Sequence, residues 1–318
     1  MTLVASCADE QRQHVIVVIG VGGTAEYGEL FHEWGSKWEV AATAGEAECT
    51  VIGRDEEADD RALLQETLSK AAAVESLEPL WLVLIGHGTF DGRAARFNLR
   101  GKDVAAADLT EWLQNSKRPI VVVNTSSSSS PFINALGGKH RVIISATKDG
   151  GQAQFSRFGG FMAEGIGGLE ADIDRDGQTS LLEAWLFAAR RTQEFYDSDN
   201  RLATEHSLLE DSGDGKGTRF EVFEGVRIRD DVKNRDELDG KMAHRWHLIR
   251  SEAERALTPQ QRTARDKLEQ QLEALRRRRS EFAETDYLDE LERILIPLAE
   301  IYENDESPED PTEPAVNN

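Results

Sequence analysis

Residues 80–88 read LWLVLIGHG, a continuous apolar run that ends in a histidine between two glycines. An unbroken apolar run of this length is typical of a strand that is buried on both faces of a parallel sheet. Three further runs of this kind are HVIVVIG at residues 14–20, IVVV at residues 120–123 and VIIS at residues 142–145. Residues 49–52 are a weaker candidate. The sequence therefore predicts a sheet of at least four buried strands.

Helical patterns separate these runs, at residues 25–38, 61–73 and 105–114, and a further one follows the last run at residues 155–166. Strands that alternate with helices predict an α/β domain with a mainly parallel sheet and right-handed crossovers. In such sheets the functional groups lie beyond the carboxyl ends of the strands. That rule selects Gly86-His87-Gly88 after one strand and the segment NTSSSSS, residues 124–130, after the next.

The composition changes near Asp239, and three helices are predicted over residues 243–257, 259–279 and 285–302. Leu268, Leu272 and Leu275 recur at helical spacing and predict one buried stripe. We expect an α/β domain over residues 14–227 and a non-catalytic helical extension over 228–303, through which the chain can self-associate. Residues 304–318 carry five acidic residues, three prolines and no basic residue, a composition that predicts a disordered acidic tail.

The chain has 59 acidic and 37 basic residues and a net charge of −22. This charge argues against nucleic acid and against an anionic membrane surface, because both require clustered Lys and Arg. No stretch is long and apolar enough to span a bilayer.

The two cysteines, Cys7 and Cys49, exclude a disulfide framework. Residues 1–13 precede the first strand, and VASC at residues 4–7 resembles the end of a bacterial lipoprotein signal, without its charged start and apolar core. Two interpretations of the compartment stay open. As written the chain is cytoplasmic, whereas a start upstream of Met1 would make it exported, either periplasmic or lipid-anchored.

Residues 172–183 read DIDRDGQTSLLE and match the calcium-loop pattern D-x-[DN]-x-[DN]-G-x5-E. Calcium prefers six to eight oxygen ligands. The predicted ligands are the side chains of Asp172, Asp174 and Asp176, the Gln178 carbonyl and both carboxylate oxygens of Glu183. We expect a structural Ca²⁺ rather than a catalytic metal, because no histidine adjoins the loop in sequence. The alternative is an acidic surface loop that caps the helix starting near Ser180.

A nucleophile in the serine-rich segment would lie on the strand end next to His87. This order, a strand followed by His87-Gly88 and then a strand followed by a nucleophile loop, resembles the caspase and legumain clan of cysteine peptidases. The resemblance covers roughly residues 15–218. The acidic loop, Thr204-Glu205-His206 and residues 211–215 are similar to the bacterial legumain-like branch. The resemblance implies a caspase-like three-layer α/β domain, proteolysis and a peptide or protein ligand.

The chain departs from this family at the nucleophile. The family places cysteine in a motif A-C-x-S-G, and aligning Ser129-Ser130 with its last two residues puts Ser127 at the cysteine position. A shift of one residue puts Ser126 there. A serine holds its proton far more tightly than a thiol of pKa about 8.5, so a direct replacement loses most of the rate.

Three interpretations follow from the serine. The first is a catalytically impaired or inactive relative of these peptidases that binds a peptide or partner protein. The second is an active hydrolase that uses a Ser127–His87 dyad. The third is an α/β scaffold, unrelated to peptidases, that binds peptides or partners.

Overall fold

The structure of the chain, a computed structural model, describes residues 12–303. The contacts divide the chain between Arg250 and Ser251 into two compact units. The predicted export-signal remnant falls almost wholly, and the predicted acidic tail entirely, outside the described residues. Within residues 12–303 no helix combines the length and the apolar character needed to cross a membrane.

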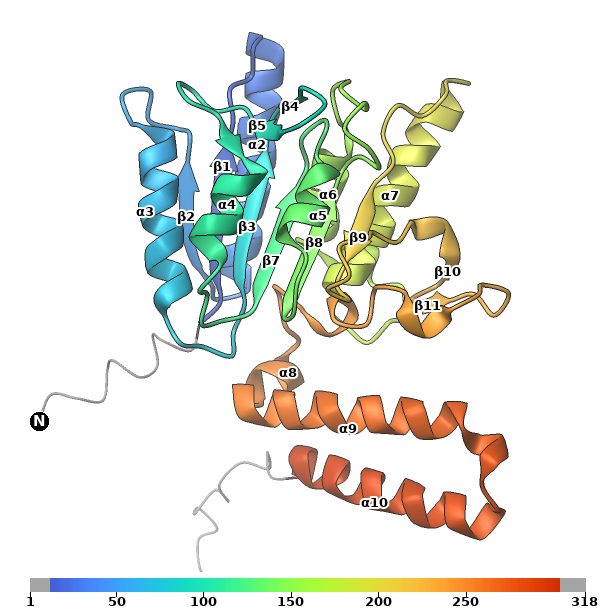
Figure 1. The fold of residues 1–318 in the computed structure, drawn as a ribbon. Helices are drawn as coiled ribbons and strands as arrows, with labels where there is room; N and C mark the ends of the chain where they lie inside the picture. The colour runs from blue at the N-terminus through green and yellow to red at the C-terminus, as the bar shows by residue number, and fades with distance from the viewer. Residues whose placement is uncertain (1–11, 304–318) are drawn as a thin grey trace, which may run out of the picture. The chain divides into compact units, whose positions relative to one another are not determined.

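The first unit is built on a six-stranded sheet with the order β2-β1-β3-β7-β8-β9 (Figure 1). Five strands run parallel, namely β1 (His14–Ile19), β2 (Glu48–Ile52), β3 (Leu80–Ile85), β7 (Ile120–Asn124) and β8 (Arg141–Ser145). The sixth strand, β9 (Leu208–Glu210), is antiparallel to β8. The prediction of an α/β unit with a mainly parallel sheet is confirmed.

Helices cover both faces of this sheet. One face packs against α2 (Ala25–Ala44), α6 (Phe158–Gly165) and α7 (Leu181–Ser198), and the other against α3 (Asp60–Ala73), α4 (Ala106–Leu113) and α5 (Pro131–Leu136). Side chains alternate between the two cores along each strand, so Val15 and Val17 join the first core while Ile16 and Val18 join the second. Both faces of the central strands are therefore apolar, which explains the unbroken apolar runs.

Two small elements extend the α/β unit. A three-stranded antiparallel sheet consists of β4 (Gly88–Phe90), β5 (Ala95–Phe97) and β6 (Val104–Ala105). A short hairpin pairs β10 (Phe223–Glu224) with β11 (Arg227–Ile228). Short 3-10 turns occupy the links between larger elements, at Leu169–Ala171, Phe220–Val222, Arg235–Glu237 and Ala243–Arg245, and in the second unit at Arg279–Glu281.

Strand β9 was not predicted, because its three residues lie in a stretch of polar, loop-like composition. Its backbone pairs with β8 on one side, and Leu209 exchanges two hydrogen bonds with Thr218, of 3.1 and 2.7 Å, on the other. The three residues of β9 are too few to show the alternation of apolar and polar side chains that indicates a strand in sequence. Pairing with β8 is what orders them.

The single helix predicted over residues 243–257 is wrong. A 3-10 turn at Ala243–Arg245 and a short helix, α8 (Glu252–Ala256), are separated by an extended segment. The Gln13 amide donates to the carbonyls of His247 and Leu248, at 3.1 and 3.2 Å, and Leu181 N–H donates to Trp246 O at 2.8 Å. These carbonyls bond across the first unit instead of within a helix, so the segment up to Arg250 belongs to the α/β unit.

The second unit is a helical hairpin of α9 (Pro259–Arg277) and α10 (Glu284–Glu303), preceded by α8. Thr258 and Gln261 form a reciprocal cap at the start of α9, where the Thr258-Pro259 pair predicts a helix start. Leu275 is buried and Leu268 and Leu272 are half-buried, in agreement with the predicted stripe.

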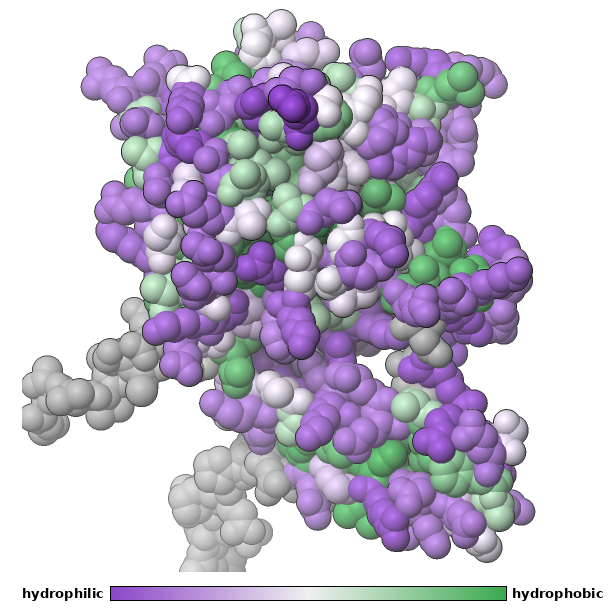
Figure 2. All heavy atoms as spheres, viewed as in Figure 1, coloured by the Kyte–Doolittle hydropathy of each residue, from purple (hydrophilic) through white to green (hydrophobic). Residues whose placement is uncertain are grey.

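The hairpin gathers apolar side chains along its two helices, while the visible face of the α/β unit is mostly hydrophilic (Figure 2). Helix α10 also leaves Leu288, Leu295 and Ile296 exposed. Exposed apolar side chains on a helix are compatible with self-association, which stays a prediction.

Candidate functional site

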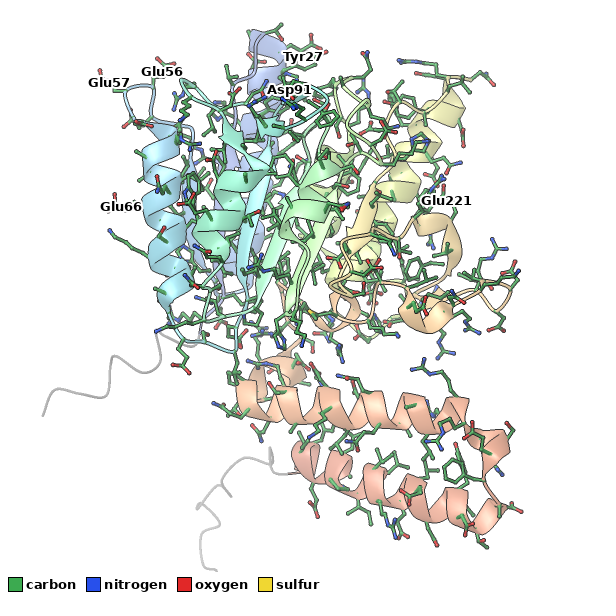
Figure 3. All side chains as sticks on the ribbon, viewed as in Figure 1. Tyr27, Glu56, Glu57, Glu66, Asp91 and Glu221 are labelled. Atoms are coloured by element: carbon green, nitrogen blue, oxygen red, sulfur yellow. The ribbon has the colours of Figure 1, made fainter. Side chains whose placement is uncertain are left out.

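The carboxyl ends of β3 and β7 lie side by side, because Leu84 pairs with Asn124 in parallel register. This register places the loop after β3, which holds His87, beside the loop after β7, residues 125–130, hereafter the serine loop. Tyr27, near the start of α2, and Asp91, in the turn after β4, lie toward the same end of the α/β unit (Figure 3). The structure therefore brings together the two loops that the sequence selects.

His87 is half-buried and held by aromatic rings. Its ring lies edge-on to Tyr27 and Phe31, with centroid distances of 5.3 and 5.1 Å, and Phe155 lies 6.2 Å away. Its Nε2 lies 3.1 Å from the Gly22 carbonyl. A carbonyl only accepts, so Nε2 carries the hydrogen and Nδ1 is the basic atom of the neutral ring. Any proton transfer to a neutral His87 therefore uses Nδ1.

Ser127 is bonded to the residue after His87 rather than to the imidazole. Its Oγ accepts from Gly88 N–H and donates to Gly88 O, both at 3.1 Å, and the residue is 2% exposed. General-base catalysis requires the proton of the nucleophile to be within hydrogen-bond reach of the base. In this arrangement the Ser127 hydroxyl donates its proton to the Gly88 carbonyl rather than to the imidazole, and it accepts the Gly88 N–H.

Ser126, the alternative nucleophile, is fully buried, and its Oγ donates to Asn124 Oδ1 at 2.7 Å. Other hydroxyls of the serine loop are bonded as well. The Thr125 hydroxyl donates to Leu84 O and that of Ser130 to Lys148 O, each at 2.9 Å. Ser129 Oγ accepts from Ala146 N–H at 3.0 Å. These bonds make the loop a rigid polar connection between β3, β7 and β8.

Ser128 is the exception in the serine loop. Its Oγ has no hydrogen-bond partner although the residue is 1% exposed, and its φ of 52° is left-handed. Its N–H donates to Gln152 O at 2.9 Å. A left-handed residue other than glycine with a buried, unpaired hydroxyl carries a cost in stability. Five consecutive serines give no sequence signal that separates this residue from its neighbours.

The acidic loop brings its three aspartates together. Carboxylate oxygens of Asp172, Asp174 and Asp176 lie within 4.8 Å of one another. Asp172 accepts from the N–H groups of Asp176 and Gly177, at 3.2 and 3.1 Å, and Gly177 has the positive φ, 86°, that the sharp turn needs. An all-oxygen donor set of three carboxylates fits a hard cation such as Ca²⁺.

Glu183 lies under this loop and is 1% exposed. Its Oε1 accepts from the N–H groups of Ile173 and Asp174, at 2.8 and 3.2 Å. Its Oε2 accepts from the N–H and hydroxyl of Ser180, both at 2.8 Å. Glu183 thus caps α7 and ties the start of the loop to it, and among the described residues the three aspartates alone form the cluster with metal-ligand spacing. Gln178, another predicted ligand, donates its N–H to Asp176 Oδ1 at 3.0 Å.

The structure adds a histidine that the sequence does not associate with the loop. His244 Nε2 lies 3.8 Å from Asp174 Oδ2. Burial, together with the Glu183 and Asp176 carboxylates, raises the pKa of Asp174, and His244 acts in the opposite direction. No histidine adjoins the loop in sequence, and 69 residues separate Asp174 from His244. The fold returns the chain to the loop and places this histidine beside it.

A second acidic cluster lies where β9 leads into residues 211–215. The Asp211 carboxylate accepts from Gly240, Met242 and Ala243 N–H groups, at 2.7–2.9 Å. Asp239 in turn accepts from Asp211 N–H at 2.9 Å and from the Thr218 hydroxyl at 2.6 Å. These aspartates therefore bind backbone and hydroxyl donors within the fold.

Glu210 in this cluster has an unsatisfied oxygen. The residue is fully buried, its Oε1 accepts from Gly213 N–H at 2.5 Å, and its Oε2 has no partner. Burial raises the pKa of the Glu210 carboxyl to about 7, with Asp239 acting in the same direction.

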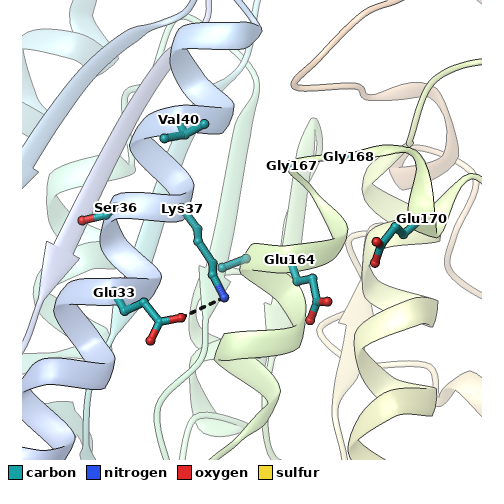
Figure 4. A pocket seen from close by; sticks show the side chains of 9 residues that line it. Glu33, Ser36, Lys37, Val40, Glu164, Gly167, Gly168 and Glu170 are labelled. Atoms are coloured by element: carbon teal, nitrogen blue, oxygen red, sulfur yellow. Dashed lines mark ion pairs between the residues drawn. The ribbon is translucent and has the colours of Figure 1, made fainter.

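A pocket of about 480 Å³ lies between α2 and the end of α6 (Figure 4). Lys37 pairs with Glu33 at 3.0 Å on one side, and Glu164 and Glu170 lie on the other. It contains none of the predicted catalytic or metal-binding residues. A second pocket, of about 300 Å³, lies beside residues 201–207.

No protein-family model matches the sequence, and no curated protein matches it. Among solved structures, the Drosophila initiator caspase Dronc is similar at 12% identity, over 67% of this chain and 84% of that one, with a TM-score of 0.43. Caspase-1 from Spodoptera frugiperda is similar at 9% identity, over 66% of this chain and 90% of that one, with a TM-score of 0.41. Both are similarities in the course of the backbone.

We predict that Gly88→Ala destabilises the α/β unit, because an added Cβ would lie 2.2 Å from Ser127 O and 2.8 Å from Ser126 Oγ. Forcing apart packed backbone costs about 1–3 kcal/mol or more. Gly28→Ala is the matched control, since its Cβ meets open space within α2 and gains up to about 1 kcal/mol. All six tryptophans precede Ser251, so urea unfolding followed by tryptophan fluorescence reports this unit. Equal midpoints for the two variants would contradict the contact.

We predict that Glu210 lowers stability as pH rises. The folded-state pKa, about 7, lies above the ordinary 4.5, so the folded chain retains a proton that the unfolded chain has lost. Its contribution is therefore full below about pH 4.5, falls between pH 4.5 and 7, and is constant above, a loss on the order of 3 kcal/mol. Glu210→Gln removes this fall. Thermal unfolding from pH 5 to 8 measures it, with exposed Glu57→Gln as control, and parallel pH profiles for wild type and Glu210→Gln would exclude it.

Proposed function

We propose that the chain is a peptidase-fold protein of the caspase and legumain type that binds a peptide or protein segment at the serine loop and cleaves it poorly or not at all. The observation that carries this proposal is the Ser127 hydroxyl, which donates to Gly88 O and accepts from Gly88 N–H. A backbone N–H beside a nucleophile is the donor that would stabilise a developing oxyanion. Here that N–H already binds the hydroxyl.

The environment of His87 supports the same proposal. A base in a serine dyad must face the hydroxyl and needs a partner that orients the ring. Within residues 12–303 the bond to Gly22 O is the only hydrogen bond of the His87 ring, and no carboxylate in that range pairs with the ring. Three aromatic rings position the imidazole sterically.

A second candidate function is hydrolysis with Ser127 as nucleophile and His87 as base. The hydrogen bond between Ser127 and Gly88 favours this candidate, because Gly88 directly follows His87 in the chain and so holds the hydroxyl close to the histidine. Rotation of the Ser127 side chain away from Gly88 would release the hydroxyl and free the N–H. The two candidates differ in whether the native chain turns over peptides.

We predict that Ser127→Cys gains peptide hydrolysis that the native chain lacks. A thiol of pKa about 8.5 ionises readily beside a histidine, whereas a serine does not. Turnover of a broad peptide library is measured for native chain, Ser127→Cys and Ser127→Cys with His87→Ala, and Ser130→Cys is the control thiol in the same loop. Activity is expected in Ser127→Cys alone.

Two results of that experiment would contradict the proposal. Turnover by the native chain that disappears in Ser127→Ala would establish the serine hydrolase instead. A folded Ser127→Cys chain with no turnover on any peptide would remove the peptidase interpretation of the loop.

We further propose that Asp172, Asp174 and Asp176, with the Gln178 carbonyl, hold one structural Ca²⁺ that stabilises the start of α7. Three carboxylates in one small cluster repel one another, and a divalent cation offsets that repulsion. Glu183 would support the loop chiefly through its backbone bonds, and a rearrangement would be needed for it to ligate through both oxygens.

We predict that calcium raises the thermal midpoint, since a ligand at about 100 times its Kd adds about 2.7 kcal/mol. Asp174→Ala should abolish this gain, whereas Glu170→Ala, which removes a nearby exposed charge outside the cluster, should retain it. Glu183→Ala should lower stability in calcium and in chelator alike, because it removes backbone caps. Scanning calorimetry in both conditions tests this, and an unchanged native midpoint would mean that the loop is an acidic turn.

A further inference from the structure

The pocket of about 300 Å³ in the α/β unit belongs to neither the serine loop nor the acidic loop. The carboxyl-terminal half of α7 forms one wall, with Gln193 and Asp197 one turn apart. The residues that line it beyond α7 include His206, Ser207 and Arg219. Glu221, which is labelled in Figure 3, lies in the turn that leads to β10. It also lines the pocket. A volume near 300 Å³ is at the lower end of ligand-binding pockets, so the pocket suits a small molecule.

Two polar groups among the residues beyond α7 have unused hydrogen-bonding capacity. Ser207 is 5% exposed, and its Oγ has no partner. His206 accepts at Nδ1 from the Gln152 amide, at 2.6 Å, so the neutral ring carries its hydrogen on Nε2, for which the described residues supply no acceptor. A buried hydroxyl without a partner costs free energy that a bound acceptor would recover.

The charge around these donors is mixed, because cations and carboxylates both lie near His206. Burial lowers the pKa of His206, the Lys148 and Arg219 cations lower it further, and the Glu221 and Asp149 carboxylates act in the opposite direction. Arg219 pairs with the exposed Glu221 and so already has one acceptor. The donors and the cation together suit a carboxylate placed against Ser207, His206 and Arg219.

The wall formed by α7 carries a negative charge. Asp197 is exposed, and none of the residues from 12 to 303 forms an ion pair with its carboxylate. Glu205, the other carboxylate nearby, is buried and accepts from Ser156 Oγ at 2.7 Å and from Phe158 N–H at 3.1 Å. Asp197 is therefore the group that suits an ammonium, and Glu205 serves the start of α6.

We propose that this pocket binds a small zwitterion of the amino-acid class. The carboxylate lies against Ser207, His206 and Arg219, and the ammonium lies against Asp197. A simple anion would meet Asp197 and Glu221, and a simple cation would meet Arg219 and Arg201, so only a ligand with both charges matches both sets of residues. Ala189 and Phe220 supply an apolar surface for the ligand's side chain.

This site is independent of the proposed peptide-binding function, although the two regions are physically connected. Gln152 donates to His206 through its side chain and accepts from Ser128 N–H through its carbonyl, at 2.9 Å. The residue thus joins the pocket to the one strained residue of the serine loop.

The test is isothermal titration calorimetry of the full chain with each of the common L-amino acids, with acetate and methylammonium as single-charge probes. Saturable binding of at least one amino acid is expected, at least about 10-fold tighter than either probe, since one lost charge contact of about 1.4 kcal/mol is tenfold. Arg219→Gln and Asp197→Asn should each weaken binding about tenfold or more.

Matched controls keep the outcome interpretable. Glu194→Gln removes an exposed α7 carboxylate outside the pocket, and Ser198→Ala removes a hydroxyl bonded to Phe195 O, so both should bind as the native chain does. Ser207→Ala should weaken binding without loss of fold, because its Oγ has no partner to lose. No binding by any amino acid would overturn the proposal, as would acetate binding as tightly as the amino acids or equal affinities in Asp197→Asn and Glu194→Gln.

Discussion

The burial of β3 on both faces is the constraint on which the α/β unit depends. All six of its residues are buried, with Trp81 and Val83 in one core and Leu82 and Leu84 in the other. A strand in this position can exist only where helices cover both sides of the sheet, and parallel neighbours require crossover helices to reach it. Three layers and an edge of aligned strand ends follow from that one requirement.

The aligned edge then determines what the polar loops can contact. Ser127 bonds to Gly88 because β3 and β7 are neighbours in register, and Gly88 permits the approach because it has no Cβ. The bonds of Ser126 and Ser129 fill a further part of the edge with internal hydrogen bonds. These hydrogen bonds hold the serine loop in one conformation, which suits recognition of a ligand. They also direct the hydroxyl protons to acceptors within the fold rather than to a catalytic base.

Several acidic residues of the chain have a structural role, in which their carboxylates accept hydrogen bonds from backbone N–H groups. Glu183 caps α7, Glu205 caps the start of α6, and Asp211 binds the N–H groups near Ala243. Carboxylates accept from backbone N–H groups at helix starts with favourable geometry and charge. Carboxylates that lack such donors within the fold stay available for ligands. Asp197 and the exposed oxygens of the acidic loop are the ones that lie at the candidate ligand sites.

The sequence by itself determined the five parallel strands of the sheet, the order of their loops and the acidic loop, because these depend on local patterns. Apolar runs such as residues 80–85 indicate burial on both faces of a sheet. Gly177 in the acidic loop fits the positive φ that its sharp turn needs. It did not determine β9, the path of residues 246–250, or the position of His244 beside Asp174. Those depend on pairing with distant segments, namely β8, the Gln13 amide and the acidic loop.

The same division applies to the functional groups. The sequence selected His87, Ser126 and Ser127 as neighbours at one sheet edge, since parallel strands align their carboxyl ends. Only the tertiary structure decided that the Ser127 hydroxyl donates to Gly88 O and that Ser128 is the strained residue. It also decided that Ser207 lies at a pocket and that its buried hydroxyl has no partner. Hydrogen-bond partners are chosen among groups far apart in sequence, by distances that no local pattern encodes.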